Sequence, residues 1–473
     1  MYTRQRNSIC HTRREHTKMQ DGLTRENKMG TMPVGKLLMS MSLPIMISML
    51  IQALYNIVDS MFVARISEDA LTAVSLAFPI QNLMIAVSTG TGVGMNSLLS
   101  KALGAKDFDR ANRAATNGLF VLLLSCVPFM LFGTLLTDWF MRTQTDIAHI
   151  IAYGDEYLRV VCIVSVGSFG AIATERLLQA TGKTVYSMIT QAVGAVINIV
   201  LDPVLIFGLC GMPAMGVTGA AVATVISQCV SFALGIVLNV CCNREISLSF
   251  RGFRPDGSII GRIYAVGVPS ILMASIGSVM TFFMNRILIA FSSTATAVLG
   301  VYFKLQSFVF MPIFGLNNGL VPIVSYNYGA KKKKRMTRSI RLAILTAVGI
   351  MALGTLAFEL IPDKLMGLYN ASEHMLSIGV PALRIIGVHF LIAGYCIVAG
   401  SVFQALGNAL PSLITSLMRQ LVVLLPVAWL LARTGDVNMV WWAFPIAEVM
   451  SAAMTTLFFV REYRAKIRPL PEE

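Results

Sequence analysis

Long apolar stretches alternate with short polar segments along almost the whole chain. Each stretch can cross a bilayer as a helix, because about 20 mostly apolar residues at ~1.5 Å rise per residue span the hydrocarbon core. The stretches fall near residues 38–63, 72–99, 116–137, 153–174, 185–209, 216–240, 261–289, 295–325, 339–361, 378–402, 411–432 and 440–461. The pattern predicts an all-α polytopic membrane protein with twelve transmembrane helices, which places it in contact with the lipid bilayer.

The composition supports this interpretation. Only 13% of the 473 residues are charged, against about 25% in soluble domains, and the mean hydropathy is +0.70. The eight cysteines are scattered through apolar stretches without metal-ligand or disulfide spacing. We therefore interpret them as core residues and expect neither a metal nor another cofactor.

The formal charge of +14 suits a nucleic-acid-binding protein, but the placement of the basic residues favours a membrane topology. Of the 38 Lys and Arg residues, 29 fall in segments that face the cytoplasm if the N-terminus does, and 4 fall in the opposite loops. This assignment puts Arg176 and Lys183 in one cytoplasmic loop. By the positive-inside rule both termini are cytoplasmic. The same rule accounts for the run Lys331–Arg335, so no nucleic-acid partner is expected.

The second half of the chain repeats the first at an offset of 225 residues. The pairs that share this register are Pro44 and Pro269, Phe78 and Phe303, Gln81 and Gln306, Gly90 and Gly315, Gly94 and Gly319, Ser100 and Ser325, Gly104-Ala105-Lys106 and Gly329-Ala330-Lys331, Arg110 and Arg335, Gly154 and Gly379, Arg159 and Arg384, Gln179-Ala180 and Gln404-Ala405, Gly182 and Gly407, and Ser187 and Ser412. Each repeat has an even number of spans, six, so the two halves point the same way. Two parallel six-helix repeats around a central cleft predict a transporter that works by alternating access.

The repeat also predicts the division of the chain. We expect a basic cytoplasmic tail over 1–36, an N-lobe over 37–240, a cytoplasmic connector over 241–262, a C-lobe over 263–461 and a cytoplasmic tail over 462–473. Residues 1–28 form a basic extension to which we assign no role, and Met19 or Met29 is an alternative start.

One acid, Asp59, lies within the first span. A charge at membrane depth costs ~3 kcal/mol on insertion scales, so such an acid usually faces the protein interior and has a function. The structural alternative is that Asp59 sits at the outer end of the span and is hydrated.

The fifth span carries Asn198 and Asp202, four residues apart and therefore on one helix face. Counted from the inner ends of their spans, Asp59 and Asp202 reach similar depths in the N-lobe. Two neighbouring carboxylates in a low dielectric do not both stay ionised cheaply, so the pair binds a proton or a cation. The alternative for Asp202 is an Asp-Pro turn that ends the span.

The second repeat lacks these acids, because Met284, Val423 and Val427 stand at the corresponding positions. The predicted ion site therefore belongs to the N-lobe. The C-lobe carries its own network of charged residues, in which Glu448 pairs with either Lys304 or Arg419. We expect structural pairing, with substrate recognition or conformational coupling as the alternative role.

Six stretches together make the sequence recognisable. They are LPIMISMLIQALYNIVDSMFVA, SKALGAKDFDRANRA, LLQATGKTVYSM, INIVLDPVLIFG, VYFKLQSFVFMPIFGLNNGLVPIVSYNYGAKKKKR and PSLITSLMRQ. In these the chain resembles the multidrug and toxic compound extrusion (MATE) family, in its MepA-like branch near the DinF-like transporters, over about residues 30–465.

The resemblance implies export of cationic and lipophilic drugs across a bacterial plasma membrane, driven by inward movement of H⁺ or Na⁺. It also implies that Asp59, Asn198 and Asp202 form the ion or proton site, which a hydroxyl of the sixth span completes in relatives. Thr224 is the candidate for that hydroxyl. Since twelve spans in one chain suffice for transport, a monomer is expected.

Adaptable apolar side chains predict the substrate cleft, because methionine repacks around different ligands and aromatic faces attract organic cations. The residues expected to line the cleft are Gln52, Tyr55, Met280, Phe283, Met284, Gln306 and Phe310. The structural alternative is that these side chains face lipid or core.

Other functions fit the sequence less well. A flippase for lipid-linked saccharides shares the wider architecture, but twelve spans and a modestly charged cleft argue against it. A major-facilitator transporter also has two six-span halves, but loop 2–3 lacks the GxxxDRxGR pattern. An ATP-driven pump would need a phosphate-binding loop, and no G-x-x-x-x-G-K-[ST] motif occurs. A structural or receptor protein would not need an acid pair in one repeat only.

Overall fold

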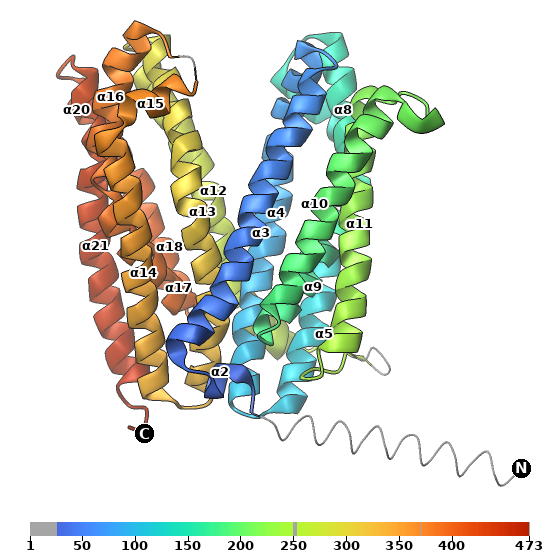
Figure 1. The fold of residues 1–473 in the computed structure, drawn as a ribbon, viewed down its shortest axis with the longest axis vertical. Helices are drawn as coiled ribbons and strands as arrows, with labels where there is room; N and C mark the ends of the chain where they lie inside the picture. Colours follow the sequence, from blue (N-terminus) through green and yellow to red (C-terminus); the bar gives the residue numbers. More distant parts are fainter. Residues whose placement is uncertain (1–25, 249–252, 370, 473) are drawn as a thin grey trace, which may run out of the picture.

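The computed structural model describes residues 26–248, 253–369 and 371–472. All regular structure in these ranges is helical, and the helices form two bundles that stand side by side (Figure 1). The N-lobe contains α3 (Val34–Ala64), α4 (Glu68–Gly104), α5 (Phe108–Leu124), α6 (Val127–Leu135), α7 (Thr137–Gln144), α8 (Ala148–Ile163), α9 (Val166–Ala180), α10 (Thr184–Phe207) and α11 (Gly216–Cys242). It is preceded by the short helix α2 (Lys28–Thr31).

The C-lobe repeats this order of helices. It contains α12 (Gly257–Ile289), α13 (Ser293–Gly329), α14 (Lys333–Leu360), α15 (Pro362–Gly367), α16 (Glu373–Gly387), α17 (Phe390–Ala405), α18 (Leu410–Leu417), a π-helical segment (Met418–Leu424), α19 (Leu425–Ala432), α20 (Val437–Trp441) and α21 (Ala443–Glu462). Within the described ranges, ten helical stretches are long and apolar enough to cross a membrane, and the bent pairs α8–α9 and α16–α17 bring the total to twelve. The predicted fold class is therefore confirmed.

The internal repeat is visible in the local geometry. The bends between α8 and α9 and between α16 and α17 measure 47° and 49° and lie at equivalent positions. Lys106 and Lys331, which are 225 residues apart, both adopt positive φ, of 58° and 60°. The serine that caps α4, Ser67, accepts a hydrogen bond from the third residue after it, and so does Ser292 before α13. The two halves therefore share backbone detail as well as sequence.

Glycines of the repeat lie where the two lobes touch. A methyl group added at Gly94 of α4 would collide with the backbone carbonyl of Ile263 in α12, and one at Gly319 of α13 would collide with Ser42 in α3. Small residues at such crossings let helix backbones approach closely. Because α4 packs on α12 and α13 packs on α3, these helices connect the two lobes.

The lobes converge at the end that carries α2 and the last described residues of the C-lobe, and they diverge toward the other end (Figure 1). Two glycines close the converged end, since a methyl group at Gly104 would meet the carbonyl of Tyr326, and one at Gly329 would meet the carbonyl of Lys101. Any larger side chain at either glycine would wedge the ends of α4 and α13 apart.

The segment Glu26–Met32 bridges the lobes at this converged end. Asn27 donates a hydrogen bond to the carbonyl of Thr181 in the N-lobe at 3.0 Å. Arg335 of the C-lobe donates to the carbonyl of Met32 at 2.6 Å. Residues 26–28 of the basic extension are therefore ordered parts of the fold, and residues 1–25 lie outside the described residues.

Two expected segment boundaries differ from the helices. The helix α3 begins at Val34, inside the expected tail 1–36, and α12 begins at Gly257, inside the expected connector 241–262. In α12 the helix extends past the apolar stretch because the side chain of Asp256 caps it by accepting from the N–H groups of Ser258 and Ile259. Pro33 precedes α3 without a side-chain capping hydrogen bond.

Candidate functional site

The acid pair lies between two neighbouring helices of the N-lobe. Asp59 is near the C-terminal end of α3 and Asp202 is in α10, and these helices pack together. The helix α10 continues through Pro203 to Phe207 and ends at Gly208, whose φ is 73°. Asp202 is therefore within a helix, fully buried at 0% exposure, and the Asp-Pro turn is wrong.

Two polar side chains, those of Asn198 and Thr224, lie beside Asp202. The side-chain amide of Asn198 donates to Asp202 Oδ1 at 3.3 Å and lies 3.4 Å from the hydroxyl of Thr224 on α11. All three residues are buried. The structure thus brings together the residues that the sequence predicted, including the hydroxyl from the sixth span.

Several buried oxygens of this cluster lack a donor. Among the described residues, no hydrogen-bond partner reaches Asp59 Oδ1, Asp202 Oδ2 or Asn198 Oδ1. The two carboxyl groups lie close enough for one to hydrogen-bond the other when protonated. Because ionised carboxylates only accept hydrogen bonds, this cluster can hold a shared proton or a small cation.

A tyrosine that sequence reasoning missed adjoins the pair. Tyr157 of α8 is buried, accepts a hydrogen bond from Gln81 at 2.9 Å and lies within electrostatic range of Asp59. The only signal in the sequence was the repeat match of Gln81. Nothing in the sequence places Tyr157 beside the first span, since it comes from a different helix.

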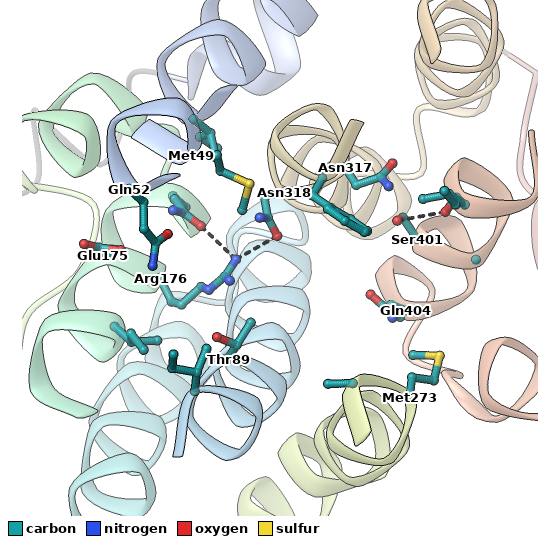
Figure 2. A pocket seen from close by; sticks show the side chains of 18 of the residues that line it. Met49, Gln52, Thr89, Glu175, Arg176, Met273, Asn317, Asn318, Ser401 and Gln404 are labelled. Atoms are coloured by element: carbon teal, nitrogen blue, oxygen red, sulfur yellow. Dashed lines mark hydrogen bonds between the residues drawn. The ribbon is translucent and has the colours of Figure 1, made fainter. Parts of the chain in front are cut away.

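A cavity of about 750 Å³ lies between the lobes, and Figure 2 shows part of its wall. Both lobes contribute polar amides and sulfur or aromatic side chains to the wall. Among the lining residues are Met49, Gln52, Tyr55, Thr89, Gln179, Gln191, Asn198, Met273, Phe314, Asn317, Asn318, Ser401, Phe403 and Gln404. A cavity of this size accommodates a drug-sized molecule.

The acid pair lies next to this cavity, one layer of side chains away from it. Tyr55 and Asn198 line the cavity, while Asp59 and Asp202 do not. Tyr55 lies within electrostatic range of both acids, and Asn198 bonds directly to Asp202. A change at the acids can therefore reach the cavity through these two side chains.

Five of the seven residues predicted for the cleft do not line the cavity. Met280, Met284 and Phe310 are buried in the apolar core, with Met284 at 0% exposure. Phe283 points outward at 47% exposure, and Gln306 is partly buried. Sequence reasoning located the helices correctly, but the rotation of α12 and α13 about their axes points other residues inward, such as Met273 and Asn317.

The C-lobe network is smaller than predicted. Arg419 in the π-helical segment donates to Glu448 of α21 at 3.0 Å and forms an ion pair with it. Glu448 is buried, whereas Arg419 lines the cavity and is 26% exposed. Lys304 is exposed, with its ammonium 5.6 Å from the ring centre of Tyr369, so the predicted pairing of Lys304 with Glu448 is wrong. The structure selects the other alternative, Arg419.

A second charged region of the wall was missed. Glu175 and Arg176 of α9 are 8% and 7% exposed and line the cavity. The sequence predicts Arg176 in a cytoplasmic loop because it follows an apolar stretch. That placement is wrong, since α9 continues to Ala180 and points the side chain of Arg176 inward. Figure 2 shows Arg176 reaching toward Asn318.

The comparison with known proteins follows the internal repeat. The family model described as MatE matches residues 44–204 and again residues 269–430, two segments that begin 225 residues apart. The chain belongs to the MatE family. The recognition of a MATE family member from the six sequence stretches is thereby confirmed, and each of the two family segments lies within one lobe.

Relatives of this MatE chain match it over nearly its whole length. The multidrug export protein MepA of Staphylococcus haemolyticus is 26% identical over 433 residues, which cover 91% of this chain and 94% of that protein. An outward-facing multidrug resistance MATE family transporter of the MOP superfamily has a TM-score of 0.87 at 25% identity and covers 95% of this chain and 99% of its own.

A second solved structure is a MOP superfamily transporter from Pyrococcus furiosus, with a TM-score of 0.86 at 25% identity. It covers 95% of this chain and 99% of its own, and a reversed polarity of its binding pocket suggests a different function for that protein. The MatE chain is thus a multi-pass membrane protein of a transporter family, and the polarity of its own cavity bears on what it carries.

Proposed function

We propose that this MatE protein is a secondary active exporter of cationic and lipophilic small molecules, driven by inward movement of H⁺ or Na⁺. It would act as a monomer in the bacterial plasma membrane, with both termini in the cytoplasm. The relatives named for multidrug export support the substrate class, and the positive-inside charge distribution supports the orientation.

The observation that carries the proposal is the acid pair beside the cavity, in which Asp202 is buried and Asp59 is half-buried. Asp59 and Asp202 each keep one oxygen without a donor among the described residues, and that oxygen is available to a proton or a cation. The pair occurs in one lobe, so ion binding stabilises one arrangement of the N-lobe without a competing site of the same kind in the C-lobe.

Ion binding and substrate binding are coupled in the proposed cycle. In the outward-facing state, H⁺ or Na⁺ enters the cluster of Asp59, Asn198, Asp202 and Thr224. The carboxylates are neutralised and the packing of α3 against α10 changes. Through Tyr55, this change lowers the affinity of the cavity for a cationic substrate. Coupling requires that the ion bind the two states with different affinity.

The proposal is tested by ethidium efflux from proteoliposomes, with a pH gradient and a Na⁺ gradient imposed separately. We expect one gradient to drive efflux in the wild type, and Asp59→Asn to abolish it without loss of folded protein. The matched control is Asp69→Asn, because Asp69 is an exposed acid of the same lobe that pairs with His149.

Normal gradient-driven efflux in Asp59→Asn would overturn the assignment of the ion site. Absence of efflux under both gradients from folded wild-type protein would overturn the exporter itself and favour the lipid-linked flippase.

A further inference from the structure

Opposite charges stand on consecutive residues of the cavity wall without forming an ion pair. Glu175 accepts a hydrogen bond from the side-chain amide of Gln191 at 2.7 Å. Arg176 donates from Nη1 to Gln179 at 3.1 Å and to Asn318 at 2.9 Å. Within the described ranges, no carboxylate lies within 4.0 Å of the Arg176 guanidinium, although its neighbour in the chain is an acid.

Neutral side-chain amides form hydrogen bonds with both charged groups but use only part of the hydrogen-bonding capacity of each group. A guanidinium has five N–H donors, and the described residues accept only from Nη1 of Arg176. Glu175 Oε1 likewise has no donor in the part of the chain that the structure describes. A buried charge is costly unless it is paired, so these groups suit a ligand that supplies the missing partners.

The position of Arg176 depends on a glycine in the neighbouring helix. A methyl group at Gly92 of α4 would lie 2.8 Å from Cγ of Arg176, closer than side chains pack. The absence of a side chain at this position therefore lets the stem of Arg176 lie against α4 while its head reaches the cavity. Figure 2 shows this head directed at Asn318 of the opposite lobe, with Glu175 set apart from it.

The C-lobe has small, uncharged residues at the two positions that correspond to Glu175 and Arg176 in the repeat. At the offset of the repeat, Gly400 and Ser401 correspond to Glu175 and Arg176, and both line the same cavity. The nearest side-chain atom to a methyl group at Gly400 would be 3.6 Å away, an ordinary contact distance. On this wall Asn317 is buried with Oδ1 unpartnered among the described residues, and it can accept from a polar group of a ligand.

We propose that the cavity selects amphoteric molecules, which carry a cationic amine and a carboxylate on one scaffold. Glu175 receives the amine, Arg176 receives the carboxylate through its free N–H donors, and the body of the molecule lies against Gly400 and Ser401. A carboxylate held by a guanidinium makes charge-assisted hydrogen bonds, the stronger class. This inference rests on the proposed export function and assigns its substrate specificity.

The alternative substrate, a plain organic cation, fits the same cavity less completely. It satisfies Glu175 but places a positive charge near Arg176, whose charge has no acidic partner within 4.0 Å in the described ranges. The ion pair of Arg419 and Glu448 does not change the net charge that a bound cation meets, because its two charges neutralise each other.

The test compares two fluorescent probes that differ in one group, a zwitterionic xanthene dye with a free carboxylate and its methyl ester. Gradient-driven efflux of both is measured in proteoliposomes. We expect Arg176→Gln to lower efflux of the zwitterion about tenfold or more while efflux of the ester stays within about twofold. Glu175→Gln should lower efflux of both probes, since both carry the amine.

The design contains its own controls. Efflux of the ester by Arg176→Gln shows that this variant is folded, and Thr72→Ala changes an exposed position that does not line the cavity and should leave both probes unaffected. Gly92→Ala, which displaces the stem of Arg176, should lower efflux of the zwitterion selectively while the guanidinium itself is retained.

Equal loss of both probes in Arg176→Gln and Gly92→Ala, or no loss of either, would overturn the proposal. In either case the wild type still exports both probes, so only the substrate proposal fails. Failure of the wild type to move either probe under any gradient would mean that the export function itself is wrong.

Discussion

At the scale of single residues, the ion cluster and the charged cavity wall differ in how far the sequence predicts them. Asp59, Asn198 and Asp202 were predictable because a polar group in an apolar span has few neutral explanations, and the i,i+4 spacing set two of them on one face. Glu175 and Arg176 were not, because they fall at the apparent end of an apolar stretch, where charges are ordinary.

The ion pair of Arg419 and Glu448 gives a prediction about stability. Glu448→Gln leaves the Arg419 guanidinium, whose side chain is 26% exposed at the cavity, without its charge partner. Removing one member of a fully buried pair costs about 3–5 kcal/mol, and the loss for this half-buried pair should be smaller. We expect this variant to unfold at a clearly lower temperature in detergent than the wild type. The double variant Arg419→Met/Glu448→Leu removes both charges and should recover most of the loss.

Lys304→Met serves as the control for this comparison, because Lys304 is exposed and outside the pair. If the double variant were as unstable as Glu448→Gln, the loss would come from packing and the ion pair would not explain it.

At the scale of elements, hydrophobic periodicity located all twelve spans, yet it did not predict the two bends. The bends fall at Val164-Ser165 and Val388-His389, and neither has a proline, although Gly167 and Gly387 lie within two residues of them. Conversely, Pro44 and Pro79 lie inside continuous helices. Neighbouring helices satisfy the freed backbone groups in a membrane protein, so proline is a weaker signal there than in soluble domains.

The glycines that match between the repeats lead to a second prediction. Gly94→Ala places a methyl group against the carbonyl of Ile263, so α4 and α12 have to separate and the protein should lose stability. Gly349 of α14 has nothing within 4 Å of an added methyl group. Gly349→Ala should therefore be neutral or stabilising by up to about 1 kcal/mol.

Thermal unfolding of the two alanine variants in the same detergent checks this prediction. Equal unfolding temperatures would contradict close approach of the lobes at Gly94.

At the scale of the whole molecule, the converged end of the lobes carries the bridging segment Glu26–Met32 and the last described residues of the C-lobe (Figure 1). With cytoplasmic termini, as proposed, this arrangement is an outward-facing state. The sequence predicted two parallel bundles and a cleft between them, since an even number of spans per repeat allows no other orientation. It did not predict that the polar segment before the first span closes one end, because hydrogen bonds donated to backbone carbonyls leave no pattern in a sequence.

The bridging segment therefore gives a third prediction. Asn27→Ala/Arg335→Ala removes hydrogen bonds from the segment to both lobes, and we expect the converged end to open more often. Hydrogen exchange should then rise at the ends of α4 and α13 near Lys101 and Tyr326. The control Thr337→Ala removes only a hydrogen bond within its own helix. Unchanged exchange in the double variant would show that the segment does not hold the lobes together.

The measurement that tests the central claim most directly is ion release on substrate binding. Tetraphenylphosphonium is added to purified protein in weakly buffered solution, once with a pH indicator and once after loading with radioactive Na⁺. Because substrate and ion are proposed to compete through the acid pair, the wild type should release H⁺ or Na⁺, and Asp59→Asn/Asp202→Asn should release neither while still binding substrate. Release of the same ion from the double variant, or of no ion from the wild type, would contradict the account.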